Sequence, residues 1–440
     1  MAGIYFISLG CDKNRIDAEI MAEALISAGH TITDDLAAAD AAVINTCGFI
    51  DSAKEEAIEN IFDMVRAKER GEIKAVVVTG CLAERYRGEL QAQISEIDAV
   101  LGLARNADIA ACVERALEGE RFEEYGDKES LVLNAPRALS TPQHYAYIKL
   151  AEGCSNRCTY CAIPSIRGRF RSRASGEIIA EARELAARGV RELVCVAQDT
   201  TSYGSDLEGG ETLASLLSEL AKIEGLWRIR VLYAYPERIT DELIETIASE
   251  EKIAKYLDIP LQHASAEVLR RMGRVGCGAD YLSLIEKLRS KCPDITLRSS
   301  FIVGFPGETE EQFSELLDFL GAARLERAGC FIYSAEEGTP AARMREQIPE
   351  EIKRERFERF CDMQNEILLR SLDDKVGKSV EVICDGYDGE REMFACRGDA
   401  DAPDVDSAVY IPLERDLVPG EIYTVKALAA DGADLLADFV

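Results

Sequence analysis

The sequence predicts an α/β protein in three parts: an N-terminal parallel α/β sheet, a central partial (β/α)6 barrel and a small C-terminal antiparallel β-barrel. Strand-like apolar segments alternate with helical periodicity near the N-terminus and again across the middle of the chain. After about Ser371, short strand-like segments follow one another between Gly, Pro and Asp. Because 440 residues exceed what one core usually holds, we expect three domains: residues 1–133, 140–370 and 371–440.

Three cysteines of the first part each follow a strand-like segment directly. Cys11 follows "GIYFISLG", Cys47 follows "AAVINT" and Cys81 follows "AVVVTG". In a parallel sheet the carboxyl ends of the strands share the edge where ligands bind. We therefore expect these three thiols, the N-terminal cysteine set, to lie at one edge of the sheet. Cysteines that only fill the apolar core would lie within the strands. With no His or fourth Cys nearby in the sequence, the set indicates an iron–sulfur cluster with one iron left free.

A second group of three cysteines lies in "CSNRCTYC". Cys154, Cys158 and Cys161, the central cysteine set, are separated by three and then two residues. A structural zinc site usually takes four ligands from two C-x-x-C pairs. The nearest further candidates, His144 and Cys195, lie far off in the sequence. The local ligand set is therefore open by one position.

The segments that carry the central set read as six β-α units. In such folds the chemistry lies at the carboxyl ends of the strands. The "GFPGET" loop lacks the third glycine of a dinucleotide fingerprint and does not fit a P-loop. The polar residues expected at this end are Gln198, Asp199, Gln262 and His263.

The composition indicates a soluble, cytoplasmic protein with a basic partner. The chain has 51 Lys and Arg against 80 Asp and Glu, a net charge of −29, which disfavours generic binding to nucleic acid or anionic membranes. It shows neither a basic leader nor an apolar run of about 20 residues. Fourteen cysteines without a secretion signal point to reduced thiols. Eight are scattered and are expected to be small hydrophobic residues: Cys112, Cys195, Cys277, Cys292, Cys330, Cys361, Cys384 and Cys396.

The spacing of the central set, with Tyr160 just before the last cysteine, resembles the signature of radical S-adenosylmethionine (SAM) enzymes. The chain combines this motif with the N-terminal set and with a C-terminal segment that resembles a TRAM domain. In this combination the whole chain is similar to the methylthiotransferase family of those enzymes. "SLGCDKNRIDAE", "YLDIPLQHAS" and "ADAPDVDSAVY" are similar to the branch that modifies a ribosomal protein. In "DVDS", that branch usually has a glycine after the second Asp.

The resemblance implies two 4Fe-4S clusters, one on each cysteine set, with SAM bound at the open iron of the central cluster. SAM would serve as methyl donor and as oxidant, and sulfur and electron donors would be needed. The implied reaction adds a methylthio group to the β-carbon of an aspartate in small-subunit ribosomal protein twelve, and no side chain is assigned a catalytic role. The expected contacts to SAM or substrate are Gln198, Gln262, Ser265, Gly304 and Glu308.

Two alternatives remain: a transfer RNA methylthiotransferase, and a non-enzymatic iron–sulfur sensor that binds ribosomes. TRAM domains often hold RNA, but residues 371–440 contain six Lys and Arg against seventeen Asp and Glu. A face with this charge repels phosphate, so no direct nucleic-acid binding is expected. Four alternating arginines, if extended, would line one face, either solvated or bound to carboxylates: Arg167, Arg169, Arg171 and Arg173.

Overall fold

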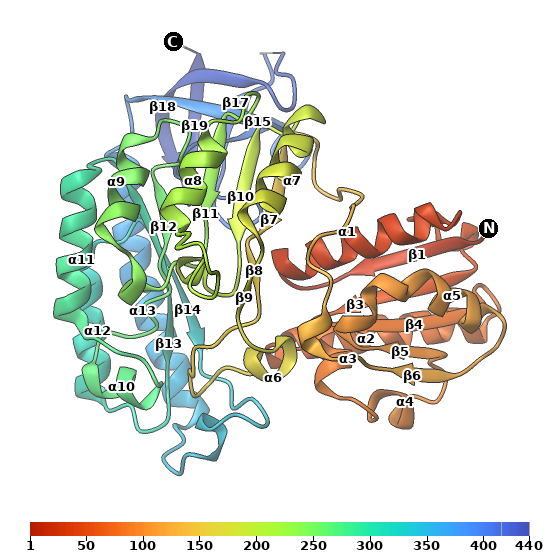
Figure 1. The fold of residues 1–440 in the computed structure, drawn as a ribbon. Helices are drawn as coiled ribbons and strands as arrows, with labels where there is room; N and C mark the ends of the chain where they lie inside the picture. The colour runs from red at the N-terminus through yellow and green to blue at the C-terminus, as the bar shows by residue number, and fades with distance from the viewer. Residues whose placement is uncertain (415, 440) are drawn as a thin grey trace.

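The computed structural model describes residues 1–414 and 416–439 and confirms the three-part α/β architecture (Figure 1). The N-terminal part is a six-stranded parallel sheet in the order β2-β1-β3-β4-β5-β6. Its strands are β1 (Gly3–Ser8), β2 (Thr31–Thr33), β3 (Ala41–Thr46), β4 (Ala75–Gly80), β5 (Ala99–Leu101) and β6 (Phe122–Glu124). Its helices are α1 (Asp12–Ser27), α2 (Asp51–Glu69), α3 (Cys81–Arg85), α4 (Leu90–Gln93) and α5 (Ile109–Leu117).

Both faces of this sheet are buried, which explains its continuous apolar strands. Successive side chains of a strand point to opposite faces. Ile44 and Val78 thus pack in a cluster with α2, whereas Val43 and Val77 pack in a cluster with α1 and α5. The two faces together hold β1, β3 and β4 in place, and with them the loops that carry the N-terminal cysteine set.

The central part contains the six predicted parallel strands. They form the sheets β7-β10-β11 and β12-β13-β14, joined at one isolated parallel bridge between Ile229 and Ile253. The strands are β7 (Tyr145–Lys149), β10 (Glu192–Val196), β11 (Arg228–Val231), β12 (Tyr256–Asp258), β13 (Thr296–Val303) and β14 (Arg327–Ile332), with the short hairpin β8 (Ala151–Glu152) and β9 (Arg171–Ser172). The helices are α6 (Ile163–Arg167), α7 (Ser175–Ala187), α8 (Leu213–Ala221), α9 (Asp241–Ser249), α10 (Ala266–Arg271), α11 (Gly278–Lys291), α12 (Glu310–Ala323) and α13 (Glu350–Asp373).

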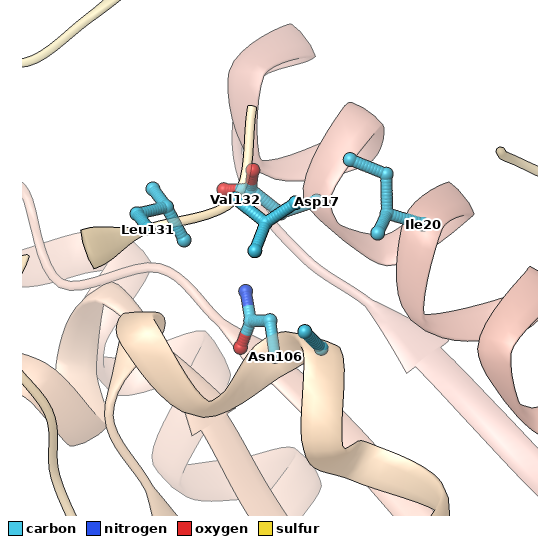
Figure 2. Close-up of a pocket in the computed structure, with 6 residues that line it drawn as sticks. Asp17, Ile20, Asn106, Leu131 and Val132 are labelled. Atoms are coloured by element: carbon cyan, nitrogen blue, oxygen red, sulfur yellow. The ribbon is translucent and has the colours of Figure 1, made fainter. Parts of the chain in front are cut away.

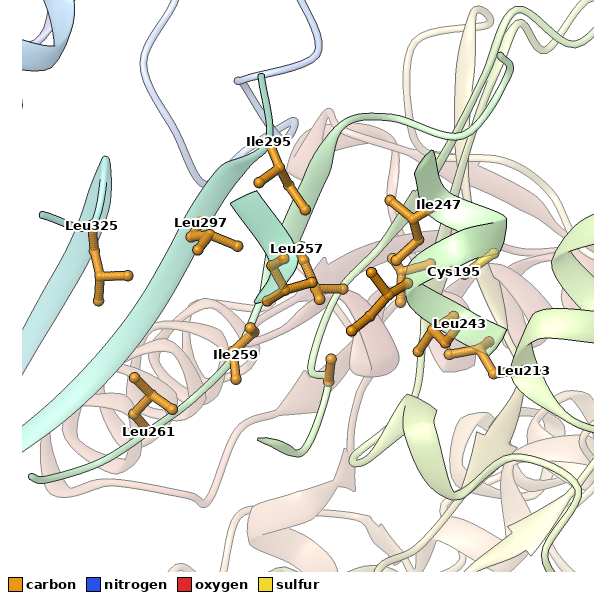
Figure 3. Packing of buried hydrophobic residues seen from close by; sticks show 14 of the residues in the cluster. Cys195, Leu213, Leu243, Ile247, Leu257, Ile259, Leu261, Ile295, Leu297 and Leu325 are labelled. Carbon is orange, nitrogen blue, oxygen red and sulfur yellow. The ribbon is translucent and has the colours of Figure 1, made fainter. Parts of the chain in front are cut away.

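The main core lies between these strands and the helices outside them. Figure 3 shows Leu257 and Leu297, from β12 and β13, near Leu243 and Ile247 of α9. Cys195 of β10 lies fully buried in the same cluster, as expected for a structural cysteine. Cys112, Cys292, Cys384 and Cys396 are also buried, whereas Cys277, Cys330 and Cys361 are half-buried.

The inner face of the partial barrel is covered from two sides. Tyr147 and Tyr256 belong to an apolar cluster that also contains Ile16 and Ile20 of α1 and Ala402 of the C-terminal part. Helix α1 therefore packs against the strands of the partial barrel, and the N-terminal sheet is held beside it (Figure 1).

The C-terminal part is a closed five-stranded barrel, β15-β16-β17-β19-β18. The strands are β15 (Ser379–Asp388), β16 (Met393–Arg397), β17 (Val409–Pro412), β18 (Ile422–Asp431) and β19 (Asp434–Phe439). All pairings are antiparallel except that of β17 with β19. The sequence showed the first four strands but not β19.

An acidic loop between β16 and β17 attaches this barrel to the central part. Asp401 binds Arg327 at 2.8 Å, and Tyr256 donates to Asp406 at 2.6 Å. Part of the negative charge that the sequence places in the C-terminal part is thus neutralised inside the molecule. Among the described residues, no helix is long and apolar enough to cross a membrane.

Candidate metal centres

The N-terminal cysteine set meets at one edge of its sheet, as predicted. Cys11 precedes α1, Cys47 follows β3, and Cys81 begins α3 directly after β4. The loops pack closely: a Cβ on Gly10, where φ is +94°, would lie 2.9 Å from Cβ of Cys47, and one on Gly48 would lie 2.8 Å from the backbone nitrogen of Leu82. Glycine at both positions lets the three loops approach one another.

The central cysteine set lies after β8 and is fixed by backbone hydrogen bonds. The amide of Cys154 donates to the carbonyl of Gly168 at 3.1 Å, and that of Cys161 donates to the carbonyl of Cys158 at 3.2 Å. Between them, Thr159 donates to the carbonyl of Met272 at 2.9 Å. The loop is thereby held against the segment after α10.

The extension of β11 contacts the central cysteine set and a residue close to the N-terminal set. The phenol oxygen of Tyr235 lies 3.4 Å from Sγ of Cys158. Two residues earlier, the ring of Tyr233 lies 3.3 Å from Nζ of Lys13, which follows Cys11 by two residues. Tyr233 has a left-handed φ of 61°, a strained conformation that clusters at functional sites. The two cysteine sets therefore lie on either side of one short segment.

The donor atoms fit multi-iron clusters. Burial raises the pKa of Cys81 and of Cys161 to about 12 and that of Cys154 to about 11. Binding of a metal cation to the sulfur favours the thiolate form of such groups. No three His, Cys, Asp or Glu side chains of the described part converge tightly enough for a single metal ion. In a cluster each thiolate binds a different iron, so its ligands lie farther apart.

His144 and Cys195 do not complete a zinc site with the central set. Nε2 of His144 lies 2.7 Å from Oδ1 of Asp385 in the C-terminal barrel. Cys195 lies within the apolar core. Neither residue is available to complete a tetrahedron around the central thiols.

Three of the five expected SAM or substrate contacts follow strands of the partial barrel: Gln198, Gln262 and Gly304. Gln198, just after β10, donates to Glu152 at 3.0 Å, and its Oε1 is buried without a partner. Gln262 follows β12 with a φ of +71°, and its backbone bonds Ser300 and Ile302. An open buried acceptor such as that of Gln198 fits a ligand that carries an N–H group.

Glu308, Gly304 and Ser265 each have a close structural contact. Glu308 accepts from Arg356 of α13 at 2.8 Å, and its side chain is fully buried. A Cβ on Gly304 would lie 2.3 Å from Cγ of Lys353, also on α13. Ser265 precedes α10, and its amide donates to Nδ1 of His263 at 3.0 Å.

The four alternating arginines do not line one face, because the short helix α6 and a turn interrupt the extended geometry that their spacing suggested. Arg167 and Arg173 are buried in ion pairs, Arg169 is exposed, and Arg171 donates to a backbone carbonyl. Sequence reasoning also missed Tyr235. The sequence sign of this residue is that Tyr233 and Tyr235 stand at alternate positions just after β11.

Family models match all three parts of the chain. Residues 148–320 match the radical SAM superfamily, residues 3–102 match the uncharacterized protein family UPF0004, and residues 376–440 match the TRAM domain. The fold agrees with solved structures. The radical SAM methyltransferase TsrM from Kitasatospora setae aligns with a TM-score of 0.57 at 14% identity, covering 88% of this chain and 79% of that one. Fold and cysteine motif thus define a radical SAM protein.

Curated relatives narrow the class further. A protein of Desulforamulus reducens is 47% identical over 100% of this chain and 99% of its own length. One of Desulforudis audaxviator is 49% identical over 99% of this chain and 96% of its own. Both are named ribosomal protein uS12 methylthiotransferase RimO. The chain belongs to the RimO family.

Proposed function

We propose that the protein is a radical SAM methylthiotransferase that adds a methylthio group to the β-carbon of an aspartate in ribosomal protein uS12. Full-length similarity to RimO relatives supports this reaction. The observation that carries it is the pair of three-thiol sets within one chain, on either side of the Tyr233–Tyr235 segment. One set suits the cleavage of SAM and the other suits the delivery of sulfur.

Each cysteine set would hold one 4Fe-4S cluster, and SAM would bind at the central one. When bound, these groups supply one-electron cleavage of SAM and a transferable methylthio sulfur. The chain's residues would hold the two centres close to one substrate and exclude water from them. The contacts proposed for SAM and substrate are Gln198, Gln262, Ser265, Gly304 and Glu308, of which Gln198 has the open acceptor.

We divide the work among domains at residues 1–133, 140–370 and 371–440. The first would hold the sulfur-delivering cluster, the second would generate the radical, and the third would bind the body of the substrate. Acidic side chains that stay exposed on the C-terminal barrel, such as Glu390, Glu392 and Glu421, support a basic protein partner rather than nucleic acid. Such a partner, with its sulfur and electron donors, places the reaction in the cytoplasm.

A direct comparison of substrates tests this function. The reconstituted enzyme is incubated with SAM, reductant and sulfide, together with either uS12 or unmodified transfer RNA, and both are examined by mass spectrometry. A methylthio adduct on one aspartate of uS12 is the expected result. Methylthiolation of the RNA and none of the protein would favour the transfer RNA alternative. Absence of 5′-deoxyadenosine in every reaction would favour the non-enzymatic sensor.

A further inference from the structure

Four charged side chains form a buried network between the two cysteine sets: Asp17, Lys149, Glu152 and Arg167. Each of these side chains is at most 3% exposed. Nζ of Lys149 lies 2.6 Å from Asp17 and 2.8 Å from Glu152. Arg167 donates to Asp17 at 2.8 Å and to the two oxygens of Glu152 at 3.1 and 3.0 Å. Two cations and two anions thus neutralise one another away from water.

Every member of this network lies close in sequence to a cysteine of one of the sets. Asp17 is on α1, which begins directly after Cys11. Glu152 precedes Cys154 by two residues, and Arg167 ends α6, which follows the last cysteine of the central set. The network therefore connects the segments that position the two sets.

Two further side chains form hydrogen bonds with this network. Arg167 reaches Asn14 of α1 at 3.3 Å, and Gln198 donates to Glu152 at 3.0 Å. On its far side, Asp17 borders a small pocket, where Figure 2 shows it with Ile20 on α1 and with Asn106 of the N-terminal part. Within the described part of the chain, the side-chain hydrogen bonds of Asp17 to the central part are those with Lys149 and Arg167.

Arg167 also lies beside the N-terminal set. Its helix α6 packs against α3, because Ala162 and Ile166 share an apolar cluster with Cys81. Burial raises the pKa of the Cys81 thiol, and the positive charge of Arg167 lowers it by less. A cation next to a thiol favours negative charge on the sulfur.

Stability alone does not account for this network. A buried ion pair is often no more stable than apolar residues of similar volume, although removal of one partner is costly. A planar guanidinium, however, holds its partners in a fixed geometry that an apolar contact or a lysine lacks. The buried arginine is therefore suited to setting the relative position of two elements.

We propose that Arg167 is a positioning residue that fixes the N-terminal cysteine set against the central one and places positive charge beside Cys81. The proposal rests on the proposed function. In that reaction a carbon radical on the substrate must meet the sulfur at the N-terminal set, and Arg167 would hold the two sets in the position that this requires. When the two sets are misaligned, SAM is still cleaved but the sulfur is not transferred. Arg167 thus couples two reactions that could otherwise run separately.

Two substitutions separate the geometric from the electrostatic role. Arg167→Gln removes both the positive charge and the planar guanidinium. Arg167→Lys keeps the charge but loses the planar group that binds two carboxylates at once. Both variants are expected to retain iron and 5′-deoxyadenosine formation but to yield at least tenfold less methylthiolated uS12 per 5′-deoxyadenosine. The control is Arg230→Lys, which alters a fully buried, ion-paired arginine of β11 that bonds Glu192 and the C-terminal barrel.

A second readout does not depend on turnover. In a background with Cys154, Cys158 and Cys161 replaced by Ala, only the N-terminal cluster remains, and its midpoint potential is followed by electron paramagnetic resonance. Arg167→Gln should make this potential more negative, because the reduced cluster loses a nearby cation. Arg167→Lys should leave it close to that of the parent.

The outcomes separate the inference from the function on which it rests. An unchanged product ratio in both variants, or the same loss in Arg230→Lys, would overturn the positioning role. An unchanged potential in Arg167→Gln would overturn the electrostatic role. If the unsubstituted enzyme methylthiolates no uS12, the proposed function fails, while the potential still decides whether Arg167 acts on the N-terminal cluster. Should Arg167→Gln not fold, Asp17→Asn weakens the same bridge and should lower the same ratio.

Discussion

The phenol oxygen of Tyr235 lies 3.4 Å from Sγ of Cys158, and the guanidinium of Arg274 lies 3.9 Å from the ring of Tyr235. Burial raises the pKa of this tyrosine well above its usual value, so its O–H stays protonated and can donate to the thiolate. Hydrogen bonds to cluster sulfurs stabilise the reduced state. Tyr235→Phe should therefore make the potential of the central cluster more negative, so that the cluster is harder to reduce.

A redox titration followed by electron paramagnetic resonance measures this effect. The control is Tyr203→Phe, which removes another buried phenol, one that donates to the carbonyl of Arg173. Equal potentials in Tyr235→Phe and the parent enzyme would show that the phenol does not reach the cluster.

The close approach of Gly48 to Leu82 predicts a selective loss of iron. Alanine at position 48 would place a Cβ 2.8 Å from the backbone of Leu82 and should push the loops of Cys47 and Cys81 apart. Iron should fall from about eight to about four per chain, while 5′-deoxyadenosine formation persists. Gly176→Ala is the matched control, since its Cβ would meet nothing within 4 Å. Full iron content in Gly48→Ala would contradict the packing of these loops.

Glu192 attaches the C-terminal barrel to the base of the central part. It accepts from Arg230 at 2.9 Å and from Arg397 of β16 at 2.5 Å, and its side chain is fully buried. Breaking a buried pair costs about 3–5 kcal/mol. Glu192→Gln should lower the free energy of opening of β16, measured by hydrogen exchange, by an amount on that order. The exposed Glu381→Gln should leave it unchanged.

The ion pairs of Glu192 also predict that the stability of β16 depends on pH. Burial alone would raise the pKa of Glu192, but Arg397 and Arg230 outweigh burial and lower it below its usual 4.5. The stabilisation is therefore complete above about pH 4.5 and is lost as the pH falls through the lower folded-state pKa. In apoprotein, protection of β16 in the parent should fall toward that of Glu192→Gln only in this acidic range. If the difference in protection between the parent and Glu192→Gln disappeared near neutral pH, the ion pair would be contradicted.

Local patterns predicted the parts of the fold that have local causes. β1, β3 and β4 were visible as apolar, β-branched segments of six residues, and the cysteines after them followed from the geometry of parallel strands. β2, β5 and β6 have three residues each, which is too short for periodicity to detect. β19 also escaped sequence analysis.

The contacts between distant segments could not be predicted in this way. The alternation of arginines suggested one extended face, yet Arg167 ends a helix and binds Asp17, 150 residues away in sequence. Likewise, the charge of the C-terminal part did not reveal that Asp401 and Asp406 point inward to the central part. Such pairings depend on how the three parts pack against one another. No local pattern in a single sequence indicates that packing.

Under the proposed function the two cysteine sets perform different tasks, and two triple Ala variants separate these tasks. Each variant is incubated with SAM, reductant, sulfide and uS12, and both 5′-deoxyadenosine and methylthiolated protein are quantified. Without Cys11, Cys47 and Cys81, the enzyme should still form 5′-deoxyadenosine but no methylthio adduct. Without the central set it should form neither. A methylthio adduct from the first variant, or 5′-deoxyadenosine from the second, would contradict the division of tasks.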